Sequence, residues 1–361
     1  MTTGRAAPVP LLFRGSAVNM GDSSAWRAIV FVTMLFDVED IISPEADDIT
    51  ARVADLVWDR GTRATFCVVG ERARQWSDRG RFDVIRSLAR HDVGFHTSLH
   101  SVHPTILETL ADKGWEDGVS SVLAAEGPGV HRISSAFARH PSCFGGPGNT
   151  WGPQVNEAMR QLGVPAVVYA HSRVPRGDVH RYCGAICYPV GRSLGDDALH
   201  VTEVWKANLK RLIGEAEARR DRGDQWMELF MGHPSRMLHD EFWDGPNFSF
   251  GKNPPASQWK RPRPKSQGDV EIVLKNLGAS IDAILGLPGI QPRTIREMNE
   301  LFAGAREEEL TPQEAAEASG LLVQNIDSMA QWVILRPDLD LRNVRAVAEA
   351  RVDTLRRLVL R

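Results

Sequence analysis

The chain has 361 residues, of which 42% are hydrophobic and 25% are charged, and its net charge is -3 at pH 7. This balance is typical of a globular protein, and it excludes the global basic field that attracts nucleic acid or an anionic membrane. The length suits one large α/β barrel with extensions, without a second compact domain.

The first part of the chain predicts an arm followed by a βαβ unit. Residues 1–26 mix Gly, Pro and Ser without periodicity, so we expect a flexible N-terminal arm. The apolar run 28–36 is rich in β-branched residues and predicts a strand buried on both faces. Helical spacing of apolar residues follows, and a second buried strand is predicted over 64–69. This order implies parallel strands and an α/β fold.

The alternation of helices and strands continues to about residue 300, so we expect an α/β barrel over residues 27–300. Two capping boxes, Thr294 with Glu297 and Thr311 with Glu314, predict the starts of late helices. Residues 301–361 are expected to form a helical C-terminal extension. Further strands are predicted over 93–95, 166–169 and 226–231, and further helices around 82–88, 153–163 and 270–284.

Polar side chains directly follow several of the predicted strands. The loops at the carboxyl ends of parallel strands converge over one face, so these side chains are expected to lie together. They are Asp37, Glu39 and Asp40 after the first strand, His96 and His100 after the strand at 93–95, His171 after 166–169, and His233 after 226–231.

His96 and His100 are the clearest candidates for metal ligands. Two imidazoles four residues apart can face one side of a helical turn and bind a cation together. The same spacing on an ordinary surface helix does not by itself indicate a metal site. The carboxylates after the first strand add to the case, because imidazole and carboxylate with open positions form a catalytic metal sphere. The alternative for the acidic cluster is the N-terminus or turn of the next element.

Three segments occur in order: FDVED at 36–40, GTRATFCVVG at 61–70 and HDVGFHTSLHSVHP at 91–104. Together they resemble the NodB-homology polysaccharide deacetylases. The form Asp-Val-Glu-Asp resembles the allantoinase-like and peptidoglycan-deacetylase branch of that family. The resemblance covers roughly residues 28–300 and implies a distorted (β/α) barrel that hydrolyses an amide with the help of a metal ion.

The resemblance also implies roles for individual residues. Asp37 corresponds to the general base, and His96 and His100 correspond to metal ligands. His233, which follows a late strand, corresponds to the acid that protonates the leaving amine. Two imidazoles and a carboxylate favour zinc, although other first-row metals fit the same set.

The sequence leaves the third metal ligand open between Glu39 and Asp40. Alternation along an extended strand end turns Glu39 to the same side as Asp37, which favours Glu39. Asp40 fits instead if the strand has already ended.

The third motif of the family differs in this chain. Gly145 stands where the family has an arginine that orients the base. The glycines of segment 143–151 either bring backbone N–H groups to a developing oxyanion or form a simple turn. We expect Gly148 and Trp151 to contact the substrate.

An aromatic-rich loop spans residues 240–262 and is expected to lie near the active face. Trp243 in this loop is expected to form a stacking wall for a sugar or another ring. The alternative is that the loop packs on its own hydrophobic side chains.

These patterns predict a metal-dependent hydrolase that removes an acetyl or similar acyl group from an amide nitrogen of a sugar or related metabolite. Ring-opening hydrolysis of a cyclic amide, as in the allantoinase-like branch, is the alternative reaction. The missing arginine is the one feature that favours a catalytically inactive barrel that binds a carbohydrate or metabolite. The expected partner is a small-molecule or oligosaccharide substrate. We expect binding to neither nucleic acid nor a membrane.

The cysteines and the N-terminus favour the cytoplasm. Four cysteines in a chain of this length do not form a disulfide framework, so we expect reduced thiols. The apolar run at residues 9–13 is interrupted by Pro10 and lacks a convincing cleavage site, so it does not predict a signal peptide.

The C-terminal tail contains apolar positions, such as Leu321 and Ile326, that we expect to pack either on the barrel or on a partner chain. The sequence therefore leaves a monomer and a homo-oligomer as alternatives.

Overall fold

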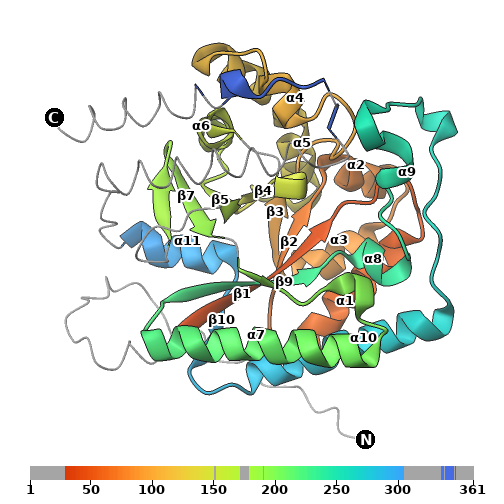
Figure 1. Cartoon of the computed structure of the whole chain (residues 1–361), viewed down its shortest axis with the longest axis vertical. Helices are drawn as coiled ribbons and strands as arrows, with labels where there is room; N and C mark the ends of the chain where they lie inside the picture. The colour runs from red at the N-terminus through yellow and green to blue at the C-terminus, as the bar shows by residue number, and fades with distance from the viewer. Residues whose placement is uncertain are drawn as a thin grey trace, which may run out of the picture.

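A computed structural model of the chain shows a central, mainly parallel β-sheet with helices packed around it (Figure 1). The expected N-terminal arm, Trp151, His171, the second capping box and most of the helical extension lie outside the described residues. The structure describes residues 29–149, 152–170, 179–189, 191–304, 335–336, 338–344 and 346.

Strands and helices alternate along most of the chain. The strands are β1 (Val30–Val38), β2 (Thr65–Val68), β3 (Asp92–Phe95), β4 (Phe144–Gly145), β5 (Ala166–Ala170), β6 (His180–Tyr182), β7 (Ala185–Pro189), β8 (Arg192–Ser193), β9 (Trp226–Gly232) and β10 (Ile290–Pro292). The α-helices are α1 (Ala46–Trp58), α2 (Gly70–Asp78), α3 (Phe82–Ala89), α4 (Ile106–Leu110), α5 (Trp115–Phe137), α6 (Pro153–Gln161), α7 (Thr202–Arg222), α8 (Pro234–Leu238), α9 (Gly245–Phe248), α10 (Gln267–Leu285) and α11 (Ile295–Gly304). Short 3-10 helices are η2 (Pro147–Asn149), η3 (Asp196–Ala198), η4 (Ser249–Gly251) and η5 (Ala256–Gln258). None of the helices in the described segments has the length and hydropathy to cross a membrane.

The sheet has ten strands in the order β6-β7-β5-β4-β3-β2-β1-β9-β8, and β10 pairs with the first residues of β1. Every pair is parallel except β6 with β7. Within the described segments, no pairing joins the two ends of this order, so the barrel is incompletely closed. The predicted distorted (β/α) barrel is therefore confirmed.

β1 lies at the centre of the sheet and explains the continuous apolar run in the sequence. It pairs with β2 on one side and β9 on the other, and all of its residues except Phe31 are buried. Phe36 stacks on Phe66 of β2 with ring centroids 4.9 Å apart. A strand covered on both faces needs apolar side chains at every position, so it shows no alternation.

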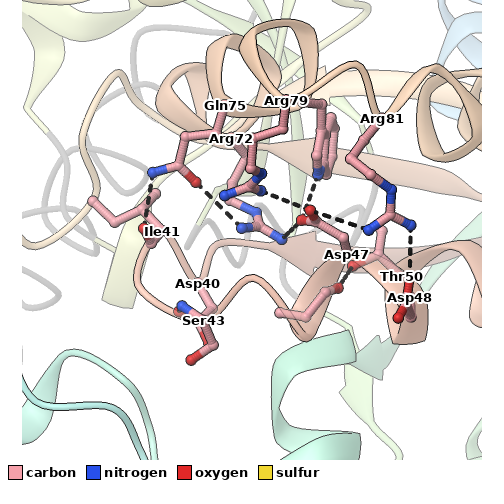
Figure 2. A network of polar contacts seen from close by, with 12 residues as sticks. Asp40, Ile41, Ser43, Asp47, Asp48, Thr50, Arg72, Gln75, Arg79 and Arg81 are labelled. Atoms are coloured by element: carbon pink, nitrogen blue, oxygen red, sulfur yellow. Dashed lines mark hydrogen bonds and ion pairs between the residues drawn. The ribbon is translucent and has the colours of Figure 1, made fainter.

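Asp47, near the start of α1, is a buried carboxylate surrounded by arginines (Figure 2). Its Oδ1 atom accepts hydrogen bonds from Arg72 Nη2 and from Trp76 Nε1, which is 2.8 Å away. Its Oδ2 atom accepts from Arg79 Nη2 at 2.7 Å. Asp47 and Arg72 are each 1% exposed. This network ties α1 to α2, and each buried charge depends on its partner because water does not reach it.

We predict that Asp47→Ala lowers the free energy of unfolding by about 3–5 kcal/mol, because it leaves the buried Arg72 guanidinium without its counter-charge. Chemical denaturation measures the change. Glu271→Ala is the control, since it breaks an exposed ion pair with Arg52, and it should cost less than about 1 kcal/mol. Equal small losses in both variants would contradict a structural role for the Asp47 network.

Candidate active site

Two loops, at the carboxyl ends of β1 and β3, bring three candidate metal ligands together. Glu39 follows β1, and His96 and His100 follow β3. One potential ligand atom from each of these three buried residues lies within 4.8 Å of the other two. A carboxylate and two imidazoles in this arrangement match the ligand set of a catalytic divalent cation.

The geometry around Glu39 fits a cation. Glu39 Oε2 lies 2.8 Å from His100 Nε2 and 3.6 Å from His96 Nε2. His100 Nε2 is buried, and its one close polar contact among the described residues is this ion pair with Glu39. An imidazole nitrogen and a carboxylate oxygen that face each other in a buried site are both atoms that a divalent ion can bind.

The ionisation state of Glu39 also suits a cation. Burial by itself raises the pKa of Glu39, but the neighbouring His233 and His100 outweigh it and hold the pKa well below the ordinary value. The carboxyl group is therefore ionised at neutral pH, which is the form that binds metal ions.

A backbone carbonyl orients His96. Its Nδ1 atom lies 2.6 Å from the carbonyl oxygen of Gly145, at the end of β4. A carbonyl only accepts, so Nδ1 donates and the lone pair of Nε2 is left facing Glu39. Gly145 is the position at which the resemblance led us to expect an arginine, and here its backbone contacts a candidate ligand.

The expectation that His96 and His100 lie on a helical turn is wrong. Both residues lie in the loop after β3, where Thr97 has φ 64° and His100 has φ 58°. Two left-handed residues exclude a helix. The turn is held by a hydrogen bond from the His100 backbone N–H to Thr97 Oγ1 at 2.8 Å. The spacing of two histidines does not distinguish this loop from a helix.

The two aspartates near Glu39 have different surroundings. Asp37 Oδ2 lies beside the candidate ligands, 3.8 Å from His96 Nε2. Asp40 instead closes the turn before α1, because its Oδ1 atom accepts from the backbone N–H groups of Ile42 and Ser43 at 2.8 and 3.0 Å. Of the two carboxylates that the sequence left open, only Glu39 belongs to the group of candidate ligands in the described segments.

His233, which follows β9, adds a third imidazole to the site. Its Nε2 atom lies 3.9 Å from Asp37 Oδ2 and 3.7 Å from Glu39 Oε2. Its Nδ1 atom lies 2.8 Å from Asp196 Oδ2, which also accepts from the His233 backbone N–H at 2.6 Å. Burial by itself lowers the pKa of His233, but Glu39 and Asp196 outweigh it and raise the pKa to about 10. A protonated imidazole held in this way is a positioned proton donor.

Asp196 was not predicted from the sequence. It follows β8, which has only two residues and therefore leaves no hydrophobic period to detect. The rule that functional side chains follow strands selects Asp196 once this strand is known.

The position of Trp243 corrects the expectation of a stacking wall. Trp243 is 1% exposed, its ring lies 5.1 Å from that of His100, and its Nε1 atom donates to Glu39 Oε1 at 3.2 Å. The aromatic loop packs on its own hydrophobic side chains, since Phe248 contacts both Trp243 and Trp259. A buried ring contacts the candidate ligands and has no free face for a sugar.

Two further residues concern contact with a substrate: Phe242 of the aromatic-rich loop, and Gly148, which was expected from the sequence. Phe242 is 40% exposed, and its ring lies 5.0 Å from that of His233. Gly148 lies in η2, one residue beyond β4, with φ 53° in the left-handed region that favours glycine. The expected contact of Gly148 with the substrate stays a prediction.

We predict that Asp196→Asn lowers the pKa of His233 from about 10 by about 1–3 pH units, because it removes a carboxylate that stabilises the protonated ring. Titration of the metal-free protein followed by NMR measures this value. Asp197→Asn is the matched control, since Asp197 is adjacent but exposed, and it should leave the pKa of His233 unchanged. The same pKa in all three proteins would contradict the proposed influence of Asp196.

Comparison with family models gives no match, and no curated protein sequence matches the chain. Solved structures do match. A Mycobacterium smegmatis protein, whose name gives its activity provisionally as a polysaccharide deacetylase, superposes with a TM-score of 0.50 at 13% identity, covering 83% of this chain and 97% of that one. A family 4 carbohydrate esterase from Streptomyces lividans gives 0.40 at 11% identity, covering 73% and 91% of the two chains. The peptidoglycan deacetylase PdaC from Bacillus subtilis gives 0.38 at 14%, covering 77% and 93%. The first similarity shows that this chain has the polysaccharide-deacetylase fold.

Proposed function

We propose that the protein is a metal-dependent hydrolase that removes an acetyl or similar acyl group from an amide nitrogen of a sugar or related metabolite. The observation that carries this proposal is the buried group of Glu39, His96 and His100, with Asp37 and His233 beside it. Amide hydrolysis needs a base for water, an acid for the leaving amine and an electrophile for the carbonyl, and these residues can supply or hold all three. The name of the Mycobacterium smegmatis protein with the same fold agrees with deacetylation.

Glu39, His96 and His100 would hold the metal ion, and their chemistry favours zinc. When bound, a divalent ion supplies the positive charge that polarises a carbonyl group and makes water more acidic. The rest of the chemistry belongs to side chains. Asp37 accepts a proton from the attacking water as the new C–O bond forms. His233 donates a proton from Nε2 to the nitrogen as the C–N bond breaks, which releases a carboxylic acid and a free amine.

Asp196 supports the donor role of His233. Its carboxylate lies on the Nδ1 side of the ring, so Nε2 is the nitrogen that faces Asp37 and Glu39. This orientation directs the transferable proton toward the site. A barrel that only binds a ligand does not need a base such as Asp37 and an oriented acid such as His233 beside the candidate metal ligands. Their presence therefore favours an active enzyme over an inactive binding protein.

We predict that the purified protein binds about one zinc ion per chain and that His96→Ala/His100→Ala loses it, because two of three protein ligands are removed. Elemental analysis after dialysis measures the zinc content. His131→Ala/His140→Ala removes two exposed histidines and should keep the metal. Full zinc content in the first double variant would mean that the metal site lies elsewhere.

We also predict that Asp37→Asn retains zinc but lowers the hydrolysis of an N-acetylated sugar by at least about 100-fold, because the amide cannot accept the proton. Glu39→Gln should lose zinc and, as a result, activity. Release of acetate from N-acetylated sugars and ring opening of cyclic amides are measured in parallel, which separates the two candidate reactions. Normal turnover by Asp37→Asn in both assays would refute the mechanism.

A further inference from the structure

Two adjacent residues before α9, Trp243 and Asp244, lie behind candidate metal ligands, the first in direct contact and the second through Ser101. Trp243 Nε1 donates to Glu39 Oε1 at 3.2 Å. Asp244 Oδ2 accepts a hydrogen bond from Ser101 Oγ at 2.7 Å, and Ser101 Oγ lies 2.6 Å from His100 Nδ1. One short segment therefore supports two of the three candidate ligands.

The chain of hydrogen bonds from His100 to Asp244 has a defined direction. An ionised carboxylate only accepts, so the single hydroxyl hydrogen of Ser101 goes to Asp244. Ser101 Oγ must then accept from His100, which places the ring proton on Nδ1. The lone pair of His100 is left on Nε2, the atom that lies 2.8 Å from Glu39.

The segment that carries these residues is firmly anchored. Asn247 donates from Nδ2 to the carbonyl oxygens of Trp243 and Lys260, at 2.8 and 2.9 Å. The Asn247 backbone N–H also donates to the Asp244 carbonyl oxygen at 3.0 Å. Trp243 and Phe248 form a hydrophobic cluster with Ile41 and Val69, which follow β1 and β2. The carboxylate of Asp244 is therefore presented by a fixed part of the fold.

We propose that Asp244 is a positioning residue that holds His100, through Ser101, in the orientation in which Nε2 binds the metal ion. The inference rests on the proposed function only in requiring a metal at Glu39, His96 and His100. A partner behind a ligating histidine fixes both the ring orientation and the nitrogen that carries the proton, and its loss typically weakens metal binding by about 10- to 100-fold.

The experiment measures the zinc affinity of the full chain by competition with a chelator. Asp244→Asn and Ser101→Ala should each weaken zinc binding by about 10- to 100-fold. The zinc affinity of the double variant Ser101→Ala/Asp244→Asn should equal that of the single variant with the lower affinity. The two effects do not add, because both changes break the same chain of hydrogen bonds to His100. Ser101→Thr keeps the hydroxyl group and should restore most of the affinity.

Two variants in the same region serve as matched controls. Asp240→Asn removes a carboxylate that is 38% exposed and pairs with Lys265, and Ser249→Ala removes a hydroxyl group that donates to the Gly245 carbonyl oxygen. Both should keep zinc affinity within about two-fold of the original chain, because neither contacts a candidate ligand or its partner. The visible absorption of the Co²⁺-substituted protein reports ligand geometry and should change in Asp244→Asn but not in Asp240→Asn.

Unchanged zinc affinity and an unchanged cobalt spectrum in folded Asp244→Asn and Ser101→Ala would overturn the inference. If Asp244→Asn fails to fold, the zinc affinities of Ser101→Ala and Ser101→Thr test the inference instead. If the original chain binds zinc and His96→Ala/His100→Ala does not, the metal site stands and only the positioning role can fail. If the original chain binds no zinc, the proposed function and the inference fall together.

Discussion

The candidate site is organised around one buried negative charge, the carboxylate of Glu39. This side chain is 3% exposed, and an isolated carboxylate removed from water is strongly destabilising. Its compensation comes from the ends of different strands and from a distant loop: His96 and His100 after β3, His233 after β9, and Trp243 before α9. The arrangement of the parallel strands and the charge of Glu39 thus depend on each other. A shift of one strand end would leave the carboxylate less well compensated.

A second buried carboxylate in the same fold shows why the identity of the partners matters. Asp47 is surrounded by guanidinium groups and an indole N–H, all of which donate hydrogen bonds and offer no lone pair. Glu39 is surrounded mainly by imidazoles, whose nitrogens can donate a proton or offer a lone pair according to their own partners. The first environment satisfies a carboxylate permanently and joins helices. The second leaves room for a cation and for proton transfer, although both carboxylates lie between the end of β1 and the first turn of α1.

The sequence predicted the framework better than the details of the site. The strands β1, β2, β3, β5 and β9 lie within two residues of their predicted positions, because continuous apolar runs mark strands in a covered parallel sheet. The predicted helix at Thr294 begins with the expected capping box. Other features had no local signal. Asp196 follows a strand of two residues, the loop 96–100 depends on left-handed backbone angles, and Ser101 meets Asp244 across 143 positions of sequence. The burial of Trp243 depends on the packing of its own loop, which composition does not reveal.

The contact between His96 and Gly145 has a consequence for how this site tolerates change. The acceptor that orients the ring is a peptide carbonyl, and every amino acid carries the same group. Replacement of the side chain at this position therefore leaves the acceptor in the molecule, so a scan by alanine would pass over one of the groups that hold the site together. The orientation of His96 depends on the path of β4, and only a displacement of that strand or a chemical change to the peptide bond itself would remove it. In a barrel that lacks the expected arginine, the main chain supplies an interaction that substitutions of side chains cannot delete.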